Sequence, residues 1–279
     1  MITHAMHPSG NPDQITTIFK TQLGAMMGSV LVHKSSLIQD CLCQRGHISA
    51  WQALANPLMT INRMTAQLYI TNSRDLQDFC QRAAQYRAIA VDTEFIRKRT
   101  YWAQLCLIQI GLPDGTAAII DFLHDDLDFT PLTILLTDLA ITKVFHAAKQ
   151  DVETLFHSLN VVIAPLFDTQ LAALACGYGD QVGYGALVQK FLSITIPKDE
   201  QFSDWQARPL SDKQIAYAYQ DVTHLITLYP ILSEELHECG REGWIAAETL
   251  QLQNPLEFTP NAADAWKRVK IRPPIKPRT

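Results

Sequence analysis

The chain has 279 residues, of which 47% are apolar, and a formal net charge of −5. This length and composition predict a soluble globular protein with one large domain and appendages. A helical membrane protein is excluded, because no stretch approaches the roughly 18 to 20 apolar residues of a membrane helix. A secretory leader is not expected, because the start lacks a basic segment followed by an apolar run. A cytoplasmic location is therefore expected.

Regular patterns begin after residue 63, and residues 1–63 are interpreted as an N-terminal extension of uncertain order. Beyond it, residues 67–70 have the composition of a strand, and residues 73–86 place apolar side chains on one face of a helix. Three strand-like runs follow, at residues 88–95, 104–111 and 117–122. Their short connections predict an antiparallel meander.

Helices and strands then alternate. Residues 131–139 predict a helix, 143–147 a strand and 149–158 a second helix, and the chain from Asp168 to about Gln253 is predicted to be mostly helical. Strands first, alternation second and helices last is the element order of an α/β protein with a mixed sheet flanked by helices.

The chain ends in a basic, proline-rich segment, and residues 256–279 are interpreted as a flexible tail. Six of the 23 basic residues fall there: Lys267, Arg268, Lys270, Arg272, Lys276 and Arg278. The rest of the chain carries 17 basic against 28 acidic residues, a net charge of −11. Such an acidic body is unexpected for a protein that binds nucleic acid through charge alone, but it is expected if acidic side chains hold cations.

Two carboxylates, Asp92 and Glu94, lie at i and i+2 at the end of an apolar strand. Alternate residues of a strand share a face, so the two side chains lie together. A charged pair on a buried strand costs free energy unless cations or hydrogen bonds compensate it, which favours a metal site. The alternative for this pattern alone is a solvated strand end.

Further acidic positions follow. Asp151 falls in the first turn of the predicted helix 149–158, where an acidic residue also stabilises the helix dipole, so alone it favours a structural role. Tyr217 and Asp221 are four residues apart on a predicted helix and face the same side. Taken alone, that pair is ordinary.

Taken together, a strand D-x-E, a helix-start Asp and a helical Y-x-x-x-D, in this order, resemble the three exonuclease motifs of the DEDD superfamily. Over residues 64–253 the chain resembles the ribonuclease D family. Further signals are the run Phe-His-Ala-Ala-Lys-Gln-Asp that ends at Asp151, Phe-Asp-Thr-Gln at 167–170, and Asp-Trp-Gln-Ala-Arg-Pro-Leu at 204–210. Tyr217, four residues before Asp221, indicates the tyrosine subtype. The resemblance implies a ribonuclease H-like mixed-sheet exonuclease fold for residues 64–255.

The resemblance also implies a 3′→5′ exoribonuclease that removes 5′-mononucleotides from RNA by two-metal-ion hydrolysis. The ligands that it implies for two divalent cations, Mg²⁺ or Mn²⁺, are Asp92, Glu94, Asp151 and Asp221. Two like charges about 4 Å apart repel by about 4 kcal/mol at an effective dielectric of 20, so four clustered carboxylates should bind cations or stay partly protonated. Tyr217 is expected to orient the attacking water, since a phenol of pKa about 10 is a poor base.

For the substrate, the resemblance points to Phe95 stacking on a terminal base and Lys198 contacting a phosphate. The alternatives are a core aromatic and a solvated loop charge. The expected partners are RNA 3′ ends, with tRNA precursors as the main candidates, in tRNA 3′-end maturation or RNA turnover; no membrane and no obligate protein partner is expected.

Two other functions stay open: a DNA-directed 3′→5′ exonuclease of the same superfamily, and a non-catalytic RNA-binding module with this fold. The family usually carries one or two helical C-terminal domains, whereas the resemblance here stops near residues 263–269. The tail is therefore interpreted as a remnant of that helical module.

Overall fold

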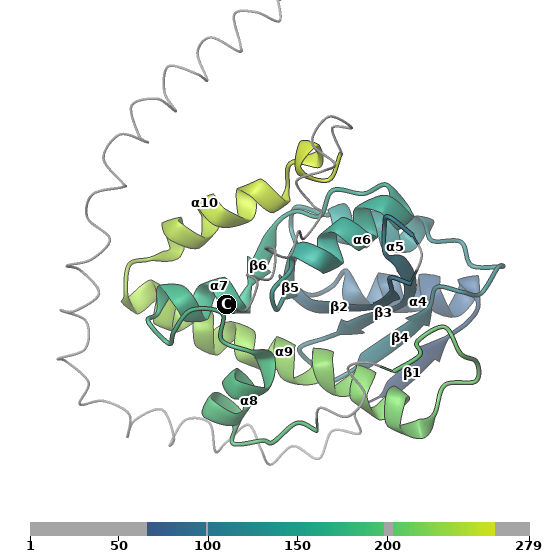
Figure 1. Ribbon diagram of the computed structural model, residues 1–279, viewed down its shortest axis with the longest axis horizontal. Coiled ribbons are helices and arrows are strands. Elements are labelled where there is room, and N and C mark those ends of the chain that lie inside the picture. The colour runs from purple at the N-terminus through teal and green to yellow at the C-terminus, as the bar shows by residue number, and fades with distance from the viewer. Residues whose placement is uncertain (1–65, 99, 198–202, 260–279) are drawn as a thin grey trace, which may run out of the picture. The chain divides into compact units, whose positions relative to one another are not determined.

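A six-stranded mixed sheet forms the core of the described part of the chain (Figure 1). The computed structural model describes residues 66–98, 100–197 and 203–259. Lys198, the extension 1–63 and the basic residues of the tail lie outside these ranges. The strands are β1 (Gln67–Ile70), β2 (Ala88–Ile96), β3 (Gln104–Gly111), β4 (Ala117–Asp121), β5 (Thr142–Phe145) and β6 (Leu166–Asp168).

The strands follow one another across the sheet in the order β1, β4, β3, β2, β5, β6. The neighbours β2, β3 and β4 are antiparallel, which confirms the predicted meander. At one side β1 runs parallel to β4, and at the other β5 and β6 continue parallel to β2. Strands and helices alternate from β5 onward, and the predicted mixed-sheet α/β class is confirmed.

Helices lie on both sides of the sheet (Figure 1). They are α4 (Ser73–Ala83), α5 (Thr130–Thr137), α6 (Lys149–Leu159), α7 (Thr169–Ala175), α8 (Tyr184–Leu192), α9 (Asp212–Glu238) and α10 (Glu242–Leu252), followed by a 3₁₀ turn, η3 (Pro255–Glu257). Helices α4, α5 and α6 share one apolar cluster with the sheet. The long helix α9 shares a second cluster with the opposite face of the sheet.

Strand β2 shows how the two faces arise from the sequence. Ile89 and Val91 belong to the cluster under α4, α5 and α6, whereas Ala88 and Ala90 belong to the cluster under α9. Successive residues of a strand point to opposite faces, so Asp92 continues the series on the α9 face. The acidic end of β2 is therefore placed under the long helix.

Helix α9 lies in very close contact with β3. A Cβ atom added to Gly111 would lie 2.5 Å from the carbonyl oxygen of Val222, so only glycine permits this approach. The helix starts at a capping box, in which the backbone N–H of Gln214 donates to Ser211 Oγ at 3.2 Å and the backbone N–H of Ser211 donates to Gln214 Oε1 at 3.0 Å. The turn that carries Asp221 is thereby held against the sheet.

Most predicted element boundaries agree with the structure to within two residues, and three differences are found. The first helix ends at Ala83, three residues early, because the backbone N–H groups of Gln85 and Tyr86 bond to the carbonyl oxygens three residues before them, at Arg82 and Ala83, and form a turn instead of a further α-helical turn. The strand predicted at 143–147 ends at Phe145, since Ala147 has a φ of 57°. The three-residue strand β6 was not predicted.

No helix among the described residues is long and apolar enough to cross a bilayer. The described cysteines are free thiols: Cys80, Cys106, Cys176 and Cys239.

Candidate active site

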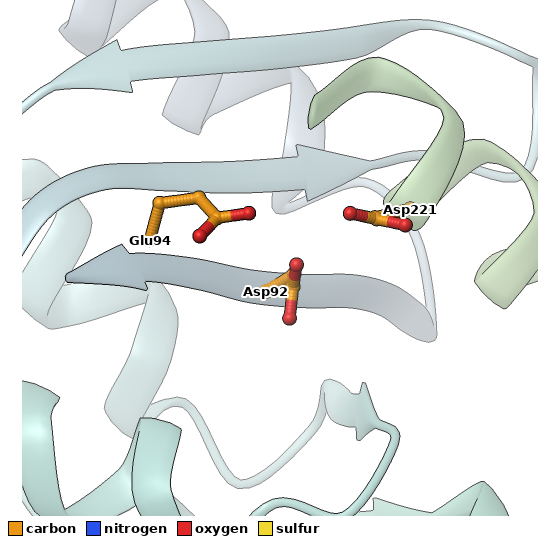
Figure 2. A group of neighbouring side chains, drawn as sticks. All are labelled: Asp92, Glu94 and Asp221. Atoms are coloured by element: carbon orange, nitrogen blue, oxygen red, sulfur yellow. The ribbon is translucent and has the colours of Figure 1, made fainter. Parts of the chain in front are cut away.

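Three carboxylates converge where the acidic end of β2 meets α9: Asp92, Glu94 and Asp221 (Figure 2). One oxygen of each lies within 4.8 Å of the others. The pairing of β2 with β5 ends at Ala90 and Val144, so Asp92 and Glu94 lie beyond the carboxyl end of β5. Sites in α/β proteins commonly lie at this edge of the sheet.

The electrostatics of the cluster reflect buried and half-buried charges without a compensating partner. Burial raises the pKa of Asp92 to about 6, although a hydrogen bond from the backbone of Thr93 opposes the shift. Burial, and then the charges of Asp92 and Asp221, raise the pKa of Glu94 to about 10. Burial and the charge of Asp92 also hold the pKa of Asp221 well above its usual range. Without a cation the cluster therefore retains protons at neutral pH.

The fourth predicted ligand, Asp151, lies beside this group but is not one of the three. It is buried in the first turn of α6, and Thr93 Oγ1 donates to its Oδ1 at 2.5 Å. Burial, and then the charge of Asp92, raise its pKa well above the usual range. Its own charge contributes to the raised pKa of Glu94 and of Asp221. The four carboxylates thus form one electrostatic unit, in which Thr93 holds the fourth.

Asp168, to which the sequence assigned no role, holds the loop before α6 in place. Its two carboxylate oxygens accept the backbone N–H groups of Ala147 at 3.0 Å and Ala148 at 2.9 Å. It also caps α7 by accepting from the N–H of Gln170 at 2.8 Å. Since Ala147 adopts a left-handed conformation, these bonds fix a turn that few residues favour. Asp168 therefore sets where α6, and with it Asp151, begins.

Tyr217 lies one turn before Asp221 on α9 and is half-buried. Burial, the charges of Asp221 and Glu94, and a side-chain hydrogen bond with Asp221 hold the pKa of its phenol far above its usual value. The hydroxyl is therefore neutral at any physiological pH and can orient a polar group, but it cannot act as a base. On the neighbouring helix, Tyr184 donates to the carbonyl oxygen of Asp221 at 2.5 Å, which ties α8 to this turn.

Of the two predicted substrate residues, the structure describes Phe95 but not Lys198. Phe95 is partly exposed and belongs to none of the three apolar clusters found in the described ranges, unlike a core aromatic. It follows a register shift between Glu94 and Phe95 in the pairing of β2 with β3, and such bulges redirect side chains. Lys198 lies outside the described residues.

The loop at 203–210 is anchored to the sheet by a hydrogen-bond network centred on Arg208. Arg208 donates from Nε and Nη2 to the carboxylate of Asp121 at the end of β4, both at 2.6 Å, and Tyr69 of β1 donates to the same carboxylate at 2.7 Å. Arg208 also donates to the carbonyl oxygen of Trp205 at 2.8 Å. The ring of Trp205 lies 6.1 Å from that of Tyr217. The network thus connects the sheet to the start of α9.

Comparison with known proteins agrees with this geometry. The profile of a family described as 3′-5′ exonuclease matches residues 67–237. The chain is 46% identical over 206 residues to ribonuclease D of Jannaschia sp., which covers 73% of this chain and 53% of that protein. A crystal structure of Escherichia coli RNase D, described as an exoribonuclease involved in structured RNA processing, superposes with a TM-score of 0.68 at 34% identity, over 73% of this chain and 54% of that one.

The match to a second solved structure extends over almost the whole of that protein's chain. Brucella melitensis NrnC with bound Mg²⁺ superposes with a TM-score of 0.59 at 29% identity, over 74% of this chain and 96% of that one. By contrast, the chain spans about half the length of the ribonuclease D proteins that it matches. The shared part is the domain that contains the three carboxylates.

Proposed function

Because this chain belongs to the 3′-5′ exonuclease family and is a homologue of ribonuclease D, we propose that it hydrolyses RNA from the 3′ end and releases 5′-mononucleotides one at a time. The observation that carries the proposal is the convergence of Asp92, Glu94 and Asp221, with Asp151 beside them. The substrates proposed are RNA 3′ ends, including tRNA precursors, in maturation or turnover.

The cluster suits two divalent cations, Mg²⁺ or Mn²⁺. Its donors are all carboxylate oxygens, which these ions prefer, and its raised pKa values show that negative charge there lacks a compensating partner. The residues proposed to hold the ions are Asp92, Glu94, Asp151 and Asp221. When bound, the cations supply activation of water and neutralisation of the charge that develops on the leaving 3′ oxygen.

The chain's own residues position the reactants. The neutral hydroxyl of Tyr217, next to Asp221, is proposed to orient the attacking water by hydrogen bonding, since its raised pKa excludes proton abstraction. Partly exposed Phe95 is proposed to stack on the terminal base, and Lys198 to contact a phosphate. Thr93 is proposed to keep the Asp151 carboxylate in one rotamer through its 2.5 Å hydrogen bond.

The test is degradation of end-labelled RNA by the full chain with Mg²⁺, with a chelator as the negative control. A single-stranded RNA with a free 3′ hydroxyl should yield 5′-mononucleotides, whereas the same RNA with a 3′ phosphate, or closed into a circle, should resist. Asp92→Asn should abolish the products, and Asp78→Asn, an exposed change on α4, should not. Cleavage of the circular RNA would exclude the exonuclease mechanism.

The same assay separates the other functions. A matched DNA oligonucleotide degraded faster than the RNA would favour a DNA-directed exonuclease. Tight RNA binding without products, in the presence of Mg²⁺ or Mn²⁺, would favour a non-catalytic binding module. A 3′-extended tRNA precursor compared with an unstructured RNA of equal length tests the proposed substrate.

A further inference from the structure

Gln109, in the middle of β3, is a completely buried polar residue with an exposed fraction of 0%. Neither its amide nitrogen nor its amide oxygen has a hydrogen-bond partner among the described residues. Buried side-chain amides nearly always have partners, because unpaired donors and acceptors cost free energy. A buried amide without one points to an interaction that belongs to this particular place in the fold.

Gln109 lies next to the carboxylate cluster. Gln109 is the cross-strand neighbour of Asp92, and directly opposite residues of an antiparallel pair have Cβ atoms about 4.5 to 5.5 Å apart on one face of the sheet. Its neighbour on the other side, Ile119 of β4, offers no side-chain hydrogen bond. Gly111, two residues along the same face, touches the carbonyl of Val222. Gln109 thus lies beside Asp92, on the face of the sheet that α9 covers.

We propose that Gln109 is a positioning residue for the metal ligands, and that its amide N–H donates to the carboxylate of Asp92 when this group binds a divalent cation. The inference rests on the proposed function above. A carboxylate that binds a cation through one oxygen keeps hydrogen-bonding capacity on the other. An amide can occupy that oxygen and hold the rotamer without adding charge to an already acidic cluster.

Packing alone gives no reason for an amide at this position. Leu107 and Ile119 on the same face of the sheet, and Val222 of α9 above it, belong to the second apolar cluster, so an unbranched apolar side chain would suit these surroundings. Removing an unpaired buried polar group is neutral or stabilising when the replacement has a similar shape. The positioning role and a purely structural role therefore predict different results for Gln109→Met.

The experiment measures Mn²⁺ binding to the full chain by titration calorimetry, without RNA. Loss of an outer-shell partner typically lowers metal affinity by about 10- to 100-fold, and we expect that rise in Kd for Gln109→Met, with a thermal midpoint of the metal-free protein equal to or above that of the parent. Ile108→Val, the next residue along β3 on the opposite face, is the packing control and should bind Mn²⁺ as the parent does.

Asp92→Asn distinguishes the two ways in which the inference can fail. If Asp92→Asn weakens Mn²⁺ binding and Gln109→Met does not, Gln109 has no positioning role and the proposed metal site stands. If Asp92→Asn leaves Mn²⁺ binding unchanged, the metal site is wrong and the inference is overturned with it. Should Gln109→Met fail to fold, Gln109→Asn decides, since it keeps the amide but withdraws it by one methylene; parent-like affinity in that folded variant overturns the inference.

Discussion

The anchor between Arg208 and Asp121 offers a test of how the loop before α9 is held. In Arg208→Met the apolar stem is kept and the guanidinium is removed. The side chain of Asp121 is only 4% exposed, and it loses both 2.6 Å hydrogen bonds from Arg208. It retains the Tyr69 hydroxyl at 2.7 Å and the backbone N–H of Leu123 at 3.1 Å.

The loss of unfolding free energy in Arg208→Met depends on the hydrogen bonds that Asp121 keeps. Removing one partner of a buried ion pair costs about 3 to 5 kcal/mol, because the other charge is left without compensation. Since two donors stay on Asp121, and Arg208 is 27% exposed so that water can enter, we expect the lower end, about 3 kcal/mol. That is a large part of the roughly 5 to 15 kcal/mol that stabilises a typical domain.

The assay is urea unfolding followed by tryptophan fluorescence, since Trp205 is buried three residues from the changed position. A double-mutant cycle with Asp121→Asn provides the control: the neutral amide removes the stranded charge, so the double variant should lose less than the sum of the single losses, by roughly 2 kcal/mol. A loss below about 1 kcal/mol for Arg208→Met, or additive losses in the cycle, would show that the network does not hold the loop.

The stability of the same variant relative to the parent should also depend on pH, in a direction set by the pKa of Asp121. Burial alone would raise the pKa of Asp121, but the hydrogen bonds from Arg208 and Tyr69 outweigh it and lower the pKa. A carboxyl whose folded pKa lies below its unfolded value of about 3.9 stabilises the fold fully above that value and loses the contribution as the pH falls through the folded pKa. In the parent this contribution should be constant from pH 7 to 5 and fall only below about pH 4. In Arg208→Met the guanidinium no longer opposes the effect of burial, so the pKa of Asp121 rises and the difference in unfolding free energy between the two proteins should already shrink as the pH falls from 7 towards 4.

Three further predictions concern the carboxylate cluster. Asp151→Asn should lower the single-turnover rate by more than the about 10- to 100-fold that loss of an outer-shell partner costs; a variant with most of the parent rate would remove Asp151 from the site. Tyr217→Phe should lower turnover by roughly tenfold, which corresponds to the free energy of one hydrogen bond, without changing the affinity for Mn²⁺. The control Tyr219→Phe, on the same helix, should keep the parent turnover. Equal rates for Tyr217→Phe and the parent would exclude the positioning role. In EDTA, the free energy of unfolding should fall as the pH rises from 5 to 9, because Glu94 in the folded protein, with a pKa of about 10, keeps a proton that the unfolded chain loses. Glu94→Gln should reduce the slope of unfolding free energy against pH. A slope equal to that of the parent would contradict the raised pKa.

Elements with long, regular patterns could be predicted from the sequence. Strands β2 and β3 are runs of eight or nine residues with buried apolar side chains, and the link between them is short, so both their existence and their antiparallel pairing were expected. The Asp-x-Glu pair could be assigned to one face because strand alternation is local. Asp221 and Tyr217 shared a helix face for the same reason.

Features that depend on contacts between distant segments could not be predicted. Strand β6 has three residues, too few for any period, and it forms because β5 offers an open edge. Asp168 and Arg208 act on backbone and side chains that lie 20 or more residues away in sequence, at positions 147, 148 and 121. Nothing in the spacing of the residues around them specifies such partners, which exist only once the sheet has assembled.

The position of α9 has a consequence for the time at which activity begins. Asp221 and Tyr217 come from a helix near the end of the described residues, whereas Asp92 and Glu94 lie near their beginning. A chain being synthesised exposes the first pair of acids well before the second has left the ribosome, and domains fold only when their elements are available. The unfinished protein therefore carries part of the carboxylate cluster but not the helix that completes it. For the proposed exonuclease activity, this order means that the RNA that encodes and surrounds the nascent chain is not exposed to a working nuclease until α9 has docked.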